Sequence, residues 1–461
     1  MSDVSENTFL TGSLGAIYVK TALPIIFVMG MNGLLNVVDA LFLGCYVGPE
    51  ALAAITLMFP AWMIIVALAT LVGGGMSSIL ARHLGGGRMD EAQAVFAGAH
   101  GLAWMISLCL MISFLAFGST TALLAAAGNE DLAGMGLAYL QITVFASPLM
   151  FTLSVNSDAL RNEGHMGFMA ALSLLVSVAN IGFTYLLVAQ LGLGVAGSAY
   201  GTVLAQLLSF NIILGFRLYG RTDLRPSALI QHSITKWWGR ILALDAPQSL
   251  NFISISLATT AVIAALQWVS GEGYDETVSA YGVITRVLTF GFLPLLGLSF
   301  AMQMITGNNF GADIWSRSDE SLRIGLIGAF VYGVFVQATL TLYAGDIGGA
   351  FVTDPAVIAE VARILPIVVA TFSLAGPIMM VGAYFQAIGD AGRAAVLGLT
   401  KNYVFAIPLT FALAGSVGEV GVWLSVPVSD LMLLAITLAV LQHTATRTTY
   451  RLGLFWAPRV V

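Results

Sequence analysis

Charge is scarce in this sequence. Only 9% of its 461 residues are Asp, Glu, Lys or Arg, whereas 58% are hydrophobic. Soluble domains carry about 25% charged residues, so this chain cannot cover a water-facing surface. The composition therefore excludes a soluble globular protein and indicates a protein that lies in a membrane.

Cysteine and catalytic motifs are also scarce. The chain has only Cys45 and Cys109, both at or within apolar runs, which excludes a disulfide framework. The HExxH, paired CxxC, GxSxG and Walker motifs are missing, and the five histidines are scattered. We expect no enzyme activity, no catalytic residues, no metal or cofactor, and no nucleic-acid binding.

One literal GxGxxG occurs, formed by Gly192, Gly194 and Gly197. A dinucleotide site needs a strand before this motif, and here it joins two apolar runs. We interpret it as a tight turn.

Long apolar runs are abundant instead. A bilayer needs roughly 20 apolar residues per helix. Twelve runs reach that length, so we predict an all-α polytopic membrane protein. They lie at about 16–44, 51–82, 94–118, 133–158, 168–190, 195–217, 242–269, 277–304, 321–343, 359–387, 392–415 and 419–444.

The longest polar stretch divides these runs into two sets of six. We predict an N-lobe at 16–220 and a C-lobe at 241–445, joined by a cytoplasmic linker at 221–240. The remaining segments, 1–15 and 446–461, are predicted cytoplasmic tails.

Basic residues alternate from loop to loop. Lys and Arg follow the even-numbered spans, whereas the opposite loops carry acidic residues and no Lys or Arg. The positive-inside rule then places both termini in the cytoplasm.

The two halves resemble each other at an offset of about 225 residues, which indicates an internal duplication. Because both halves begin and end inside, we expect parallel repeats. The matched pairs are Pro24 with Pro247, Gly85 with Gly311, and Gly164 with Gly389.

Asp39 is the most informative single residue, because it lies in the otherwise uncharged run 24–44, PIIFVMGMNGLLNVVDALFLG. An acid at this depth costs about 2.5–3.5 kcal/mol on insertion scales, so it marks an ion path, a proton relay or a ligand counter-charge. Asn32 and Asn36 share its helix face. Tyr139, Asn180, Thr184 and Thr202 on other spans supply further polar groups. The alternative is an acid held neutral by a neighbouring helix.

Other ionisable residues lie at depth. Asp430 is either functional or a buried acid that locks helices together, and Arg286 neutralises an acid or lines a cavity. Glu360 and Arg363 are three residues apart, and we expect them to form a structural ion pair. Pro24 leaves one backbone hydrogen bond unmade, so it is either a hinge or a static kink.

These segments, taken in order, resemble the multidrug and toxic compound extrusion (MATE) family. The resemblance covers nearly the whole chain and includes ALPIIFVMGMNGLLNVVDALFLG, ARHLGGGRMDEA, ALRNEG, LGLGVAGSAYGTVLAQ and YFQAIGDAGRA. It implies a V-shaped pair of six-helix lobes that export amphipathic, often cationic compounds in exchange for H⁺ or Na⁺.

Within the family the chain resembles the DinF-like branch, which couples through an acid in the first span. That acid is Asp39 here. The branch's Asn-x-x-x-Asp motif appears as Asn180 with Thr184, so the second acid is absent. A Na⁺ site prefers several charged oxygen ligands, so we favour H⁺.

We therefore predict a cation-coupled antiporter, monomeric, in the bacterial cytoplasmic membrane, that exports amphipathic small molecules. A flippase for lipids or lipid-linked precursors is the main alternative. It would need a basic cavity. A membrane-embedded prenyl-group transferase would need DDxxD-type motifs, and none occurs.

Overall fold

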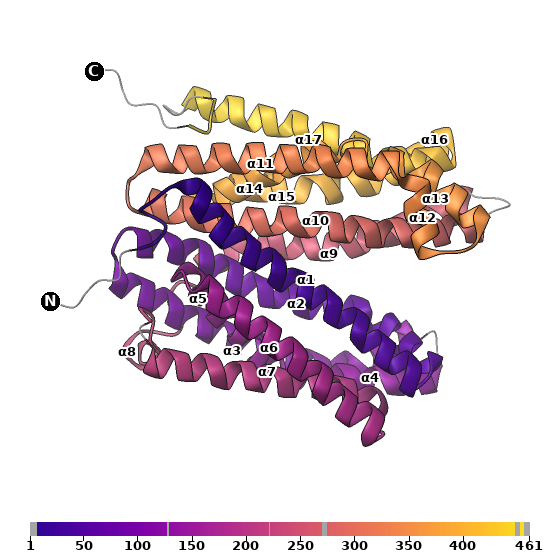
Figure 1. The fold of residues 1–461 in the computed structure, drawn as a ribbon, viewed down its shortest axis with the longest axis horizontal. Helices are drawn as coiled ribbons and strands as arrows, with labels where there is room; N and C mark the ends of the chain where they lie inside the picture. The colour runs from indigo at the N-terminus through magenta and orange to yellow at the C-terminus, as the bar shows by residue number, and fades with distance from the viewer. Residues whose placement is uncertain (1–6, 127–128, 221, 270–273, 448–451, 456–461) are drawn as a thin grey trace. The chain divides into compact units, whose positions relative to one another are not determined.

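The computed structural model describes residues 7–126, 129–220, 222–269, 274–447 and 452–455. Ten of its helices are long and apolar enough to cross a membrane, and two bent helix pairs raise the number to twelve if each pair is one span. The described elements are all helices (Figure 1). This confirms the predicted all-α polytopic fold.

The helices are α1 (Leu14–Tyr46), α2 (Pro49–Gly85), α3 (Met89–Ala125), α4 (Glu130–Phe145), α5 (Ser147–Asn162), α6 (Met166–Thr184), η1 (Tyr185–Gln190), α7 (Gly194–Tyr219), α8 (Ala228–Gln231), α9 (Trp238–Val269), α10 (Tyr274–Gly311), α11 (Trp315–Leu342), α12 (Ala344–Phe351), α13 (Pro355–Val368), α14 (Phe372–Ile388), α15 (Ala391–Leu399), η2 (Thr400–Ala406), α16 (Ile407–Val417) and α17 (Glu419–Arg447).

The chain forms two compact units. Unit 1 contains residues 1–11 and 23–249, and unit 2 contains residues 12–22 and 250–461. These boundaries differ from those predicted, because they fall inside α1 and α9. Pro24 lies just after the boundary in α1, and Pro247 just before the boundary in α9.

Helices α1 and α9 each contribute residues to both units, and hydrogen bonds at their beginnings explain this division. At the start of α1, the Tyr18 hydroxyl donates to the Ser321 carbonyl of α11 at 2.7 Å, within unit 2. In the first half of α9, the Ser249 hydroxyl donates to the Ala67 carbonyl of α2 at 2.8 Å, within unit 1. The beginning of each of these helices is thus anchored in a different unit from its end.

The internal duplication is visible in the backbone. The bent pair α4–α5 turns by 51°, and its counterpart α13–α14 turns by 48°. A π-helical segment follows in each half, η1 in the first and η2 in the second. Gly164 and Gly389, matched from the sequence, both have left-handed backbones, with φ of 86° and 88°. Each half therefore has one broken span and one π-helical turn.

The GxGxxG segment is a turn between η1 and α7. Gly192 and Gly194 both have positive φ, and Gly194 begins α7. The interpretation as a turn is confirmed.

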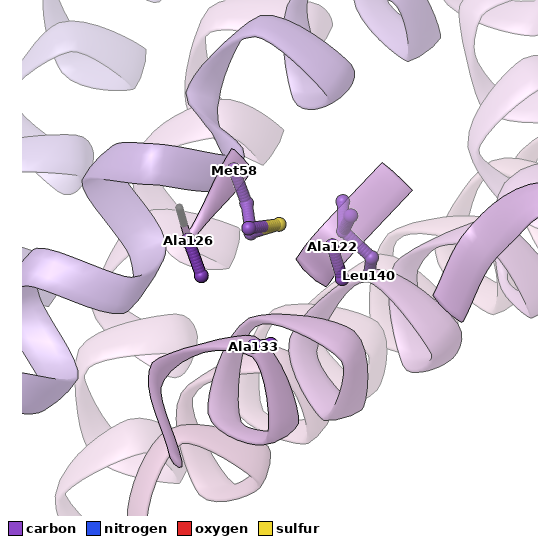
Figure 2. Close-up of a cluster of buried hydrophobic side chains, with 5 residues drawn as sticks. All are labelled: Met58, Ala122, Ala126, Ala133 and Leu140. Carbon is purple, nitrogen blue, oxygen red and sulfur yellow. The ribbon is translucent and has the colours of Figure 1, made fainter. Parts of the chain in front are cut away.

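A small apolar cluster fixes α4 against α2 and α3. Met58 of α2 packs among Ala122 and Ala126 at the end of α3 and Ala133 and Leu140 of α4 (Figure 2). Close helix approach through small residues is how helices pack in lipid. The cluster sets the position of Tyr139, the residue before Leu140.

A buried hydrogen-bond network centred on Arg217 connects α5, α7 and the loop after α7. The Arg217 guanidinium donates to Asn156 Oδ1 at 2.7 Å, to Glu163 Oε2 at 3.0 Å and to the Leu224 carbonyl at 2.7 Å. Burial raises the pKa of the Glu163 carboxyl, although the Arg217 guanidinium acts in the opposite direction. A buried charge is tolerated when it is paired and hydrogen-bonded in this way.

The left-handed turn at Gly389 is testable. A Cβ in this conformation costs about 1–2 kcal/mol, so we expect Gly389→Ala to lower the melting temperature of the detergent-purified protein. Gly392→Ala is the control, because Gly392 lies in α15 and only one side-chain atom, Asp390 Oδ1, comes within 4 Å of its Cβ position. Equal melting temperatures for both variants would contradict the assigned turn.

Candidate functional site

Asp39 points from α1 to α6 inside unit 1. The Thr184 hydroxyl, at the end of α6, donates to Asp39 Oδ1 at 3.4 Å. Thr184 is fully buried, and Asp39 is half-buried. The bond is long and the carboxyl keeps some accessible surface, so Asp39 is not locked by a strong fixed partner.

A second polar contact lies one turn earlier on α6. Asn180 Nδ2 donates to Thr202 Oγ1 of α7 at 3.2 Å. Asn180 Oδ1 is buried and has no hydrogen-bond partner in the described part of the protein. A buried acceptor without a partner costs about 1–3 kcal/mol, so this oxygen is ready to accept a proton donor or a cation.

Gly201 of α7 makes the close approach of α6 possible. A Cβ at this position would lie 2.6 Å from Thr184 Oγ1 and 3.0 Å from the Thr184 backbone. Tyr139 of α4 packs against a buried cluster that includes Leu43, one turn after Asp39 on α1. The structure thus gathers five predicted residues from four helices: Asp39, Tyr139, Asn180, Thr184 and Thr202.

Other predicted residues are not part of this group. The side chains of Asn32 and Asn36 lie outside the described part of the structure. Arg286 is exposed on α10 of unit 2 and makes no ion pair with any described residue. Pro24 is half-buried in α1 and contributes no polar group.

Asp430 lies in a separate polar group in unit 2. It accepts a hydrogen bond from the Thr371 hydroxyl at 2.7 Å, and Lys401 Nζ lies 2.6 Å from its Oδ1. Lys401 was not among the predicted site residues. The available signal was its position about ten residues inside the apolar run 392–415, where a lysine is costly.

The expected pair of Glu360 and Arg363 is present, and Glu419 joins it. Arg363 donates to both carboxylates, and the Trp423 indole donates to Glu419 at 2.9 Å. Each charged group in this arrangement has a partner within it, although one guanidinium serves two carboxylates, and this fits a structural role.

The chemistry of the Asp39 site is that of oxygen ligands. Among the described residues, no three or more His, Cys, Asp or Glu side chains form a cluster able to hold a metal ion. One carboxylate, two hydroxyls and an amide oxygen are suited to a proton or a small hard cation.

Comparisons with known proteins agree with this organisation. The MatE family model matches residues 24–186 and 247–412. The probable multidrug resistance protein YoeA of Bacillus subtilis is 22% identical over 402 residues, which cover 85% of this chain and 86% of YoeA. A FAD transporter of Shewanella oneidensis is 23% identical over 434 residues, covering 92% and 93% of the two chains.

Among solved structures, the outward-facing conformation of a multidrug resistance MATE family transporter has the same fold. The TM-score is 0.85 at 23% identity, over 94% of this chain and 96% of that chain. The family match and the membrane-spanning helices identify a polytopic membrane transporter. The chain belongs to the MatE family.

The contact at Gly201 generates a prediction. Gly201→Val forces a side chain against Thr184, and overpacking of this kind costs about 1–3 kcal/mol. We expect a lower melting temperature in detergent. Gly215→Val on the same helix is the control, since no atom beyond the neighbouring residues and backbone of its own helix lies within 4 Å of its Cβ position. If the Gly201 variant has the same melting temperature as the control, α6 and α7 are not in close contact there.

Proposed function

We propose that this protein exports amphipathic, often cationic small molecules in exchange for a coupling ion, with Asp39 as the ion-binding group. The observation that carries the proposal is the half-buried Asp39 carboxyl, bonded at 3.4 Å to Thr184, in the stretch 24–44, which contains no other charged residue. The relative YoeA, named as a probable multidrug resistance protein, supports the substrate class.

The coupling follows from solvation. A carboxyl group binds a proton more tightly in a dry environment than in water, because burial disfavours its charged form. A transporter that moves Asp39 between wet and dry surroundings therefore takes up a proton in one conformation and releases it in another. Pro24 provides a bending point in the helix that carries Asp39.

A proton is the favoured coupling ion. The other ligands near Asp39, from Asn180, Thr184 and Thr202, are uncharged, so a Na⁺ site here has only one formal negative charge. Hard cations prefer cages with more charged oxygens. We place the protein as a monomer in the bacterial cytoplasmic membrane, with both termini in the cytoplasm.

An anionic solute is the second candidate substrate. The Shewanella oneidensis relative is named as a FAD transporter, and Lys401 supplies a cationic group inside unit 2. This observation also bears on the lipid-linked flippase, but a single lysine falls short of the basic cavity that an anionic head group would need.

Replacing the acid tests the site. Asp39→Asn keeps the shape and removes the proton-binding group, so we expect transport of a lipophilic cation by proteoliposomes under a pH gradient to fall to background. Asp131→Asn, at an exposed position in the first turn of α4, should transport normally. Undiminished transport by the Asp39 variant would refute the assignment.

The coupling ion is tested with wild-type proteoliposomes and two separate gradients. We expect a pH gradient imposed without Na⁺ to drive substrate movement, and a Na⁺ gradient at equal pH on both sides to drive none. Choline replaces Na⁺ in the controls, and an ionophore clamps the membrane potential. Transport driven by Na⁺ alone would assign the four oxygen ligands to Na⁺ instead.

A further inference from the structure

An ion pair lies in the interior of unit 2, and neither of its residues belongs to the proposed coupling site. Lys401 Nζ is 2.6 Å from Asp430 Oδ1, and Thr371 Oγ1 donates to Asp430 Oδ2 at 2.7 Å. Lys401 lies about ten residues inside the span that begins with α15, and Asp430 lies about eleven residues inside α17. At 1.5 Å per residue, both are roughly 15 Å from the nearer helix end, close to the middle of a bilayer.

Both partners of Asp430 lie on irregular backbone. Thr371 is in the break between α13 and α14, where the span bends by 48°. Lys401 is in the π-helical segment η2. Transporters place solute and ion sites at such broken helices near the midplane, and π-helical turns occur frequently at functional sites. Two independent irregularities therefore meet at one buried charge pair.

The ammonium is the accessible member of the pair. The Lys401 side chain is 26% exposed and that of Asp430 only 5%. An ammonium that faces hydrocarbon at this depth is costly, so the exposed part of Lys401 faces a hydrated space or a solute. A group that approaches from that space meets positive charge first.

The Lys401 ammonium has more N–H donors than it has partners among the described residues. An ammonium has three N–H groups, and Asp430 is its one hydrogen-bond or ion-pair partner among the described residues. By contrast, Arg363 near the outer helix ends is held by two carboxylates, Glu360 and Glu419. Lys401 thus keeps capacity for a further acceptor.

We propose that Lys401 binds an anionic group of the transported solute, with a carboxylate as the simplest case. Asp430 is the internal counter-ion of the ammonium, with which a solute carboxylate competes, and Thr371 donates a hydrogen bond to Asp430. The substrate class then includes amphipathic zwitterions and organic anions as well as cations. This assignment rests on the proposed export function but not on Asp39 as its coupling group.

Two matched fluorescent probes test the proposal. Rhodamine B carries a free carboxylate, and its ethyl ester is a permanent cation with the same ring system. Binding of each to the full-length protein in detergent is measured by fluorescence anisotropy. We expect the charge-neutral double variant Lys401→Met/Asp430→Asn to bind the acid about tenfold more weakly, as loss of a charged hydrogen bond implies. Its affinity for the ester should not change.

The single variants show whether removing each charge raises or lowers the affinity for the acid. Asp430→Asn removes the internal competitor for the ammonium, so it should bind the acid about threefold or more tightly. Lys401→Arg should retain the preference of the wild type for the acid. A purely structural ion pair predicts a different pattern, in which both charge-removing single variants lose affinity for both probes together.

The results separate the two proposals. Equal changes for acid and ester, weaker acid binding by Asp430→Asn, or no discrimination by the wild type would each overturn the Lys401 assignment. Melting temperatures and size-exclusion profiles identify a misfolded single variant, in which case the double variant and Lys401→Arg still decide. If Asp39→Asn transports normally while Lys401 discriminates the probes, the coupling assignment fails and the Lys401 site stands.

Discussion

The interior of a bilayer offers no water to a charge or to an unpaired backbone group, and every polar feature of this protein is shaped by that constraint. Asp39 and Asp430 each lie beside a polar partner, whereas Arg286 is exposed and has no ion pair among the described residues. Asp39 has the Thr184 hydroxyl, and Asp430 has Lys401 and Thr371. The difference between the two sites lies in how completely the charge is neutralised. Asp39 has one long hydrogen bond, whereas Asp430 has a full counter-charge.

The same constraint governs the irregular backbone. The broken spans occur at equivalent places in the two halves. Each half also has a π-helical segment in the next span, with η1 at the end of its span and η2 in the middle of its span. Such interruptions expose carbonyl and amide groups that lipid cannot satisfy, so they persist only where protein or a hydrated cavity covers them. In each half the π-helical segment adjoins or contains a polar residue of a site: η1 follows Thr184, and η2 contains Lys401. The duplication has conserved the geometry while the chemistry has diverged, with an acid in one half and an ion pair in the other.

Much of this architecture could be predicted from the sequence. Apolar length gave the twelve spans, and the rarity of charge made Asp39 stand out. Two things could not be predicted. Helix periodicity does not show whether the beginning of α1 or of α9 packs in unit 1 or in unit 2, because packing in either unit buries the same apolar face. The role of Lys401 was hidden because its partner Asp430 lies in another span, and pairing across spans leaves no local pattern. The sequence predicted only that Asn180 and Thr202 lie in one pocket. Their hydrogen bond could not be predicted, since a sequence does not show which acceptor a side-chain donor meets.

The shared helices carry a consequence for how the chain is made. The first turns of α1 complete unit 2, which is synthesised last, and the first half of α9 completes unit 1, which by then has otherwise left the ribosome. Unit 1 is therefore unfinished until residues up to Ser249 are inserted, and the opening turns of α1 wait for a partner that does not yet exist. A chain interrupted within the polar linker would yield two fragments, each holding a piece that belongs to the other. The two halves therefore complete their folding together, after the first half of α9 has been inserted.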